Sequence, residues 1–223
     1  MLEPNSGGIS IMDKSFWHQK CEKNEIAFHE SDANPLLVKY FGRLSLTDGN
    51  RVFLPLCGKT LDIHWLLSNG YRVAGAELSK IAIQQLFKEL GVEPKISTAG
   101  EIDHYSAENI DIFVGDIFAL SRKTLGPVDA TYDRAALVAL PEEMRHRYTA
   151  HLMEITDNAP QLLICYEYDQ NLVAGPPFSI SNEEVNQRYK DKYELNRIVS
   201  VIVPGGLRGK YLATENVWLL KKL

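Results

Sequence analysis

Four positions at or just after the ends of short apolar runs are the first candidates for chemistry: Gly58, Glu77, Asp116 and Arg134. Each lies where a predicted β-strand ends, and ligands of open α/β sheets bind beyond the carboxyl ends of the strands. Glu77 follows Gly58 at the spacing of about 20 residues at which an acid binds the ribose hydroxyls in Rossmann-like folds. The spacing therefore indicates a nucleoside site, although Glu77 could instead cap the helix that follows it.

The first turn does not suit a phosphate group. The segment Gly58-Lys59-Thr60 resembles the end of a P-loop, but Phe53 occupies the position where that loop needs its first glycine. The dinucleotide fingerprint G-x-G-x-x-G is also absent, which disfavours NAD and FAD. S-adenosylmethionine, a nucleoside cofactor without phosphates, fits better. Asp116 would accept from the adenine amino group, while Ile117 and Phe118 would cover the base.

Composition and charge exclude several other classes of protein. The 223 residues carry a formal net charge of −5, so the chain lacks the basic surface of a nucleic-acid-binding protein or of a protein held on anionic lipid. We expect neither partner. The three cysteines have no C-x-x-C spacing and the histidines no H-E-x-x-H spacing, which predicts no disulfide framework and no metal. The beginning of the chain has no secretory signal pattern, and we expect a cytoplasmic protein.

Apolar runs and helical patterns alternate along most of the chain. This βαβ alternation predicts an α/β fold of the Rossmann-like kind, with a central, mostly parallel sheet and helices on both faces. Two late strands joined without a helix predict an antiparallel C-terminal hairpin at the sheet edge. We expect a flexible extension over 1–13 and one domain over 14–223. The predicted strands are 52–57, 71–78, 110–114, 128–132, 161–166, 193–203 and 213–220, and the predicted helices are 14–19, 35–44, 61–69, 81–90, 142–155 and 181–189.

Several motifs, in consistent order from about residue 14 to the C-terminus, resemble the bacterial branch of the thiopurine S-methyltransferases. They are Phe16-Trp17, Phe28-His29, Asn34-Pro35-Leu36-Leu37, the run from Arg51 to Lys59, Gly115-Asp116-Ile117-Phe118, Tyr132-Asp133-Arg134-Ala135-Ala136-Leu137 and Gly175-Pro176-Pro177-Phe178. The resemblance implies a class I methyltransferase that uses S-adenosylmethionine, releases S-adenosylhomocysteine and methylates a small thiol.

The resemblance also assigns residues. It implies cofactor contacts that are listed here together: Trp17, Cys21, Phe28, Leu56, Gly58, Glu77, Asp116, Ile117 and Arg134. Phe28 and Phe178 would contact the substrate. Cys21 departs from the family, which commonly has a second tryptophan there, and this change affects the expected substrate range more than the reaction type.

The expected reaction is an in-line attack of a thiolate on the sulfonium methyl group. Aromatic thiols are partly ionised at neutral pH, so proximity, orientation and exclusion of water would supply most of the acceleration. Arg134 would favour the thiolate by its charge, and Asp133 would orient Arg134 or the following turn, although the two residues could be a structural ion pair. Three alternatives stay open: methylation of selenium or tellurium compounds or another soft nucleophile, a non-catalytic cofactor-binding protein, and, more distantly, an NAD-dependent oxidoreductase. We expect a monomer.

Overall fold

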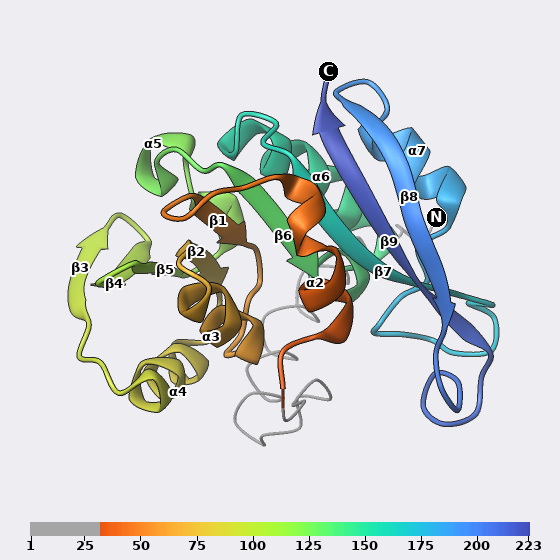
Figure 1. Cartoon of the computed structure of the whole chain (residues 1–223), viewed down its shortest axis with the longest axis horizontal. Coiled ribbons are helices and arrows are strands. Elements are labelled where there is room, and N and C mark those ends of the chain that lie inside the picture. The colour runs from red at the N-terminus through yellow and green to blue at the C-terminus, as the bar shows by residue number, and fades with distance from the viewer. Residues whose placement is uncertain (1–31) are drawn as a thin grey trace, which may run out of the picture.

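A nine-stranded mixed sheet runs through the molecule in the order β3-β4-β5-β2-β1-β6-β7-β9-β8 (Figure 1). The computed structural model describes residues 32–223. Five strands at the centre are mutually parallel, which confirms the predicted α/β class. They are β1 (Arg51–Leu54), β2 (Arg72–Glu77), β5 (Ile110–Val114), β6 (Ala130–Arg134) and β7 (Gln161–Tyr168).

Helices cover both faces of this sheet, as predicted (Figure 1). One face packs on α2 (Pro35–Tyr40), α3 (Leu61–Ser68) and α4 (Lys80–Leu90), and the other face packs on α6 (Glu142–Ile155) and α7 (Asn182–Tyr189). The central strands are therefore buried on both sides, and β1 is buried at every position. This explains why they read as continuous apolar runs in the sequence.

The C-terminal hairpin is confirmed. Strand β8 (Tyr193–Ile202) pairs antiparallel with β9 (Ala213–Lys222), and β9 pairs antiparallel with β7. Strand β8 forms one edge of the sheet.

The opposite edge was missed by the sequence analysis. Strands β3 (Lys95–Ala99) and β4 (Ile102–Ala107) add antiparallel to β5. All of β3 is exposed, so its residues show no burial pattern. Periodicity detects a strand only where one of its faces is buried.

Other short helical turns escaped prediction, namely η2 (Ile117–Ala119), α5 (Arg122–Leu125) and η3 (Leu137–Ala139). The predicted helix over 35–44 is α2 followed by the helical turn η1 (Phe41–Leu44). The turns η2 and η3 matter most because they directly follow β5 and β6.

A buried carboxylate fastens the start of α2 to the sheet. Asp62 is 2% exposed, and it accepts hydrogen bonds from the Asn34 backbone N–H at 2.7 Å and from the Tyr132 hydroxyl at 2.9 Å. Asn34 in turn caps α2 through its side chain. The first described helix is therefore anchored to β6 just before the carboxyl end of that strand. The predicted extension over 1–13 and the predicted helix over 14–19 lie outside the described residues and stay predictions.

Candidate active site

The carboxyl ends of β5, β2, β1 and β6 lie next to one another at one edge of the sheet, because these strands are parallel neighbours (Figure 1). Backbone hydrogen bonds continue beyond the strands. The Cys57 N–H donates to the Ala76 carbonyl at 3.0 Å, and the Gly115 N–H donates to the Glu77 carbonyl at 2.9 Å. The three loops that leave β1, β2 and β5 are therefore held in a defined relation to one another.

Two of these strand ends contain unusual backbone. Leu56 after β1 has φ +47° and Ala135 after β6 has φ +67°, although neither residue is glycine. Such conformations cost roughly 1–3 kcal/mol each and cluster at functional sites. The close packing behind the first turn depends on Gly75, since a Cβ there would lie 2.8 Å from the Cys57 sulfur.

Glu77 is held by backbone amides on both oxygens. Its Oε2 accepts from the Gly58 N–H at 2.8 Å, and its Oε1 accepts from the Ser79 N–H at 2.8 Å. These two hydrogen bonds fix the plane of the carboxylate beside the first turn. The two interpretations of Glu77, as a ribose ligand and as a helix cap, are compatible. Its carboxylate binds Ser79, the residue that caps α4, and also lies beside the first turn.

The first turn is occupied in a way that disfavours phosphate. The Gly58 N–H, which would face a phosphate in a glycine-rich loop, instead donates to Glu77. Lys59 pairs with Glu89, with 2.7 Å between Nζ and Oε1. Carboxylate acceptors without a nest of free amides suit a nucleoside that carries no phosphate groups. The residues present therefore fit S-adenosylmethionine.

Asp116 begins the η2 turn after β5. Its Oδ1 accepts from the Phe118 N–H at 3.1 Å, and its side chain is partly exposed. Ile117 is 6% exposed and packs in the core. The guanidinium carbon of Arg147 lies 3.8 Å from the centroid of the Phe118 ring, so one face of that ring, which we expected to cover a base, is taken by Arg147.

Asp133, which we expected to act with Arg134, is buried away from that residue, and its role in catalysis stays a prediction. Successive side chains of a strand point to opposite faces, so Asp133 and Arg134 diverge. Asp133 is fully buried on the α6 side, where Oδ2 accepts from the Tyr148 hydroxyl at 2.7 Å and Oδ1 accepts from the Leu137 N–H at 3.2 Å. The hydrogen bond to Leu137 connects Asp133 to the turn that follows Arg134. Burial raises the pKa of Asp133 to about 6, although hydrogen bonds from Tyr148, Leu137 and Ala136 oppose this shift.

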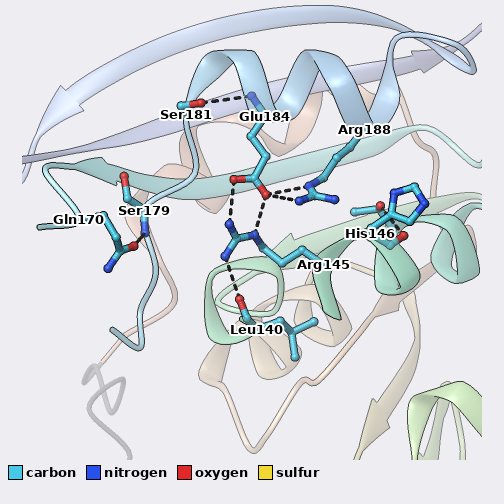
Figure 2. A network of polar contacts seen from close by, with 9 residues as sticks. Leu140, Arg145, His146, Gln170, Ser179, Ser181, Glu184 and Arg188 are labelled. Carbon is cyan, nitrogen blue, oxygen red and sulfur yellow. Dashed lines mark hydrogen bonds and ion pairs between the residues drawn. The ribbon is translucent and has the colours of Figure 1, made fainter. Parts of the chain in front are cut away.

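Phe178, expected to contact the substrate, lies beside the η3 turn. Its N–H donates to the Val138 carbonyl at 2.6 Å, and the guanidinium of Arg145 lies 5.9 Å from its ring centroid. Figure 2 shows Glu184 on α7 between Arg145 and Arg188, both of which bind it. The Arg145 Nη1 also donates to the Leu140 carbonyl at 3.0 Å.

Sequence reasoning missed the residues of α6 that support these turns, namely Arg145, Tyr148 and His151. A signal was available for one of them. Arg145 shares the buried stripe of α6 with Tyr148, Leu152 and Ile155, and a charged residue on such a stripe indicates a buried ion pair.

Three predicted cofactor or substrate contacts, Trp17, Cys21 and Phe28, lie outside the described residues. Within residues 32–223, the structure brings Leu56, Gly58, Glu77, Asp116, Ile117 and Arg134 to one edge of the sheet. In this part of the chain no cluster of three or more metal-ligating side chains occurs, and no helix has the length and apolar character needed to span a membrane.

Solved structures share this fold. A Burkholderia thailandensis 1,6-didemethyltoxoflavin-N1-methyltransferase with bound S-adenosylhomocysteine superposes with a TM-score of 0.67, covering 100% of this chain and 94% of the other at 14% identity. A magnesium protoporphyrin IX methyltransferase from Synechocystis with bound S-adenosylmethionine gives a TM-score of 0.63, covering 97% of this chain and 100% of the other at 13% identity. At these identities the likeness shows the fold of S-adenosylmethionine-dependent methyltransferases.

Relatives in sequence are much nearer. A thiopurine S-methyltransferase of Xanthobacter autotrophicus is 57% identical over 95% of this chain and 100% of its own length. One of Teredinibacter turnerae is 51% identical over 95% of this chain and 98% of its own length. The family model described as Thiopurine S-methyltransferase matches residues 12–222. The chain therefore belongs to the thiopurine S-methyltransferase family.

Proposed function

We propose that this protein is an enzyme that transfers the methyl group of S-adenosylmethionine to the sulfur of a thiopurine or of a related small aromatic or heterocyclic thiol. Family membership over residues 12–222 supports the reaction and the substrate class. The structural observation that carries the proposal is Glu77, whose carboxylate is fixed beside the first turn by the amides of Gly58 and Ser79.

The cofactor would lie across the ends of β1, β2 and β5. Glu77 would accept hydrogen bonds from the ribose hydroxyls, and Asp116 would accept one from the adenine amino group. Leu56, Gly58 and Ile117 would pack against the nucleoside, with Arg134 and the N-terminal residues Trp17, Cys21 and Phe28 completing the contacts. When bound, the cofactor supplies an activated methyl group on a sulfonium.

The acceptor would bind between Arg134 and Phe178. A thiol that loses its proton to solvent attacks as the thiolate, and the guanidinium of Arg134 would stabilise that negative charge. An arginine side chain is a poor base because it stays protonated in proteins. Its role is therefore electrostatic, and orientation of the two substrates supplies most of the remaining acceleration.

Calorimetric titration with S-adenosylhomocysteine tests the cofactor site. The wild type should bind one equivalent, and Glu77→Ala should abolish or strongly weaken binding. Glu89→Ala is the matched control, because it removes a nearby, half-exposed carboxylate that pairs with Lys59. Unchanged binding in Glu77→Ala would contradict the assignment of the ribose contact.

An acceptor screen then tests the substrate class. Methyl transfer to 6-mercaptopurine supports the proposal. Transfer to selenite or tellurite without transfer to 6-mercaptopurine would redirect it to another soft nucleophile. Binding of S-adenosylhomocysteine with no turnover of any of these acceptors would indicate a non-catalytic cofactor-binding protein.

We further infer a cytoplasmic monomer. Cys57 and Cys165 are both buried free thiols, which is typical of a reducing compartment. The edge strand β3 begins with Lys95, and charged residues on an edge discourage pairing with a second chain. Light scattering during gel filtration tests the monomer, and a dimer mass would contradict it.

A further inference from the structure

The two turns that follow β5 and β6 share a support. Both η2, which begins at Asp116, and η3, which follows Arg134, contact the same helix, α6. The contacts use different residues of α6, and each pair of residues lies one helical turn apart. Arg145 and Tyr148 reach η3, whereas Arg147 and His151 reach η2.

The η3 turn is held at both of its ends. At its start, Tyr148 donates to the Asp133 carboxylate, and the other oxygen of that carboxylate accepts from the Leu137 N–H. At its end, the Arg145 Nη1 donates to the Leu140 carbonyl at 3.0 Å. Asp133 precedes Arg134 directly, so a shift of Tyr148 is transmitted to the strand end that carries the proposed charge-stabilising group.

Arg145 connects η3 to the loop that contains Phe178. Its Nε and Nη2 bind the two oxygens of Glu184 at 2.6 and 2.9 Å, which fixes the plane of the guanidinium (Figure 2). The Phe178 ring lies near this group, and the Phe178 N–H binds Val138 within η3. A bidentate pair of this kind restricts orientation more than a single contact does.

The other pair, Arg147 and His151, holds the η2 turn. The His151 ring places Nε2 2.8 Å from the Ile117 carbonyl, so this nitrogen must carry the proton and donate. The guanidinium of Arg147 lies over the Phe118 ring, and the His151 ring centroid is 5.6 Å from that of Phe118. These contacts fix the residues directly after Asp116.

We propose that α6 carries two separable pairs of positioning residues, Arg147 and His151 for the cofactor side of the active site and Arg145 and Tyr148 for the acceptor side. None of the four touches the reacting atoms. The inference rests on the proposed function, because it assigns η2 to the cofactor and η3 with Phe178 to the acceptor. One helix would thereby set the relative position of the two substrates.

For each variant of the full chain, the test measures cofactor affinity and acceptor turnover. Calorimetry gives the Kd of S-adenosylhomocysteine, and steady-state methylation of 6-mercaptopurine at saturating S-adenosylmethionine gives kcat and the acceptor KM. His151→Leu should raise the Kd about 3–10-fold, the usual effect of one hydrogen bond, while the acceptor KM changes less than about twofold. Tyr148→Phe should lower kcat about 10-fold, because it misplaces Arg134 without touching η2. Since Arg134 is also a proposed cofactor contact, the Kd should rise, but by less than it does in His151→Leu.

Two further variants complete the design. Arg145→Lys keeps the charge but loses the bidentate contact, so it should raise the acceptor KM about 3–10-fold and leave the Kd within about twofold. It also keeps the test decisive if Tyr148→Phe does not fold. His151→Gln keeps a donor near Nε2 and should restore most of the lost affinity. His146→Leu on the exposed side of α6 is the control and should leave all parameters at the wild-type level.

Folding is checked by thermal unfolding of each variant. If His151→Leu and Tyr148→Phe change the Kd, the acceptor KM and kcat alike, or change none of them, the inference is wrong while the proposed function stands. A wild type that neither binds S-adenosylhomocysteine nor methylates any thiol would instead contradict the proposed function, and the inference would fall with it.

Discussion

Charged side chains have different kinds of partner at the two ends of the parallel strands. At the amino ends, Arg51 is 8% exposed and binds Asp111 at 2.9 Å and the carbonyls of Leu125 and Pro127. At the carboxyl ends, the carboxylates of Glu77 and Asp116 accept from backbone amides. At the amino ends a cation is paired with an anion, whereas at the carboxyl ends backbone amides orient the carboxylates. We expect the amino ends to contribute mainly to stability and the carboxyl ends to bind the ligand.

The largest effect is expected at the amino ends. Arg51→Ala leaves Asp111 and two carbonyls without this donor, and removal of one partner of a mostly buried pair costs about 4 kcal/mol of unfolding free energy. Urea unfolding measures the loss, and the affinity for S-adenosylhomocysteine should change little in the folded fraction. A loss below about 1 kcal/mol would show that this end of the sheet does not depend on the network.

Asp133 is an exception at the carboxyl ends, because its carboxyl group is buried and makes the unfolding free energy depend on pH. Its pKa of about 6 lies above the ordinary value of 3.8, so the folded state binds the proton more tightly than the unfolded state does. The stabilisation is complete below about pH 4 and is lost as the pH rises through 6. The loss amounts to about 3 kcal/mol at most.

Unfolding at several pH values tests this contribution. Asp133→Asn should flatten the dependence between pH 4 and 7, because the amide still accepts from the Leu137 N–H and can donate to the Tyr148 oxygen. An unchanged pH profile in this variant would assign the dependence to another group.

Glu77 should show the reverse of Arg51. Glu77→Gln removes the charge that would strengthen the proposed contacts with the ribose hydroxyls, and it should weaken the binding of S-adenosylhomocysteine about 30-fold. Its unfolding free energy should change by only about 1 kcal/mol, because one oxygen still accepts from an amide. Equal losses of binding free energy and unfolding free energy in Glu77→Gln would contradict the proposed difference between the amino and carboxyl ends of the strands. Calorimetry and urea unfolding on the same sample decide the point.

The smallest effect is expected at Lys59. The Lys59 side chain is 11% exposed and that of its partner Glu89 is 43% exposed, so the pair is reached by solvent on one side and Lys59→Ala should cost about 1 kcal/mol of unfolding free energy. The affinity for S-adenosylhomocysteine should stay within about twofold of the wild type. A larger loss of affinity would show that Lys59 contacts the cofactor after all.

Much of the fold was predictable because its signals are local. The run from Val52 to Leu56 is apolar since β1 is buried on both faces, and Gly91 ends α4 in a left-handed conformation that favours glycine. Strand β3 was not predictable, because an exposed edge strand takes its conformation from its neighbour and not from its own pattern. Strand β4 was also missed, because its buried residues Ile102 and Tyr105 are three apart and do not alternate.

The candidate site divides in the same way. The sequence by itself determined near which residues the strands end, to within about three residues, and the parallel topology brings Gly58, Glu77, Asp116 and Arg134 together at one edge. The sequence also indicated the family, through motifs that lie at those strand ends. These features depend on spacing along the chain, which determines where a strand stops.

Only the tertiary structure decided what each side chain does there. Asp133 and Arg134 are neighbours in the sequence, yet Asp133 is buried against Tyr148 on α6, because successive side chains of a strand point to opposite faces. Likewise, the support of η2 and η3 comes from one helix that follows both turns in the chain. Hydrogen bonds between distant segments form when the layers pack, and no local pattern encodes which partners then meet.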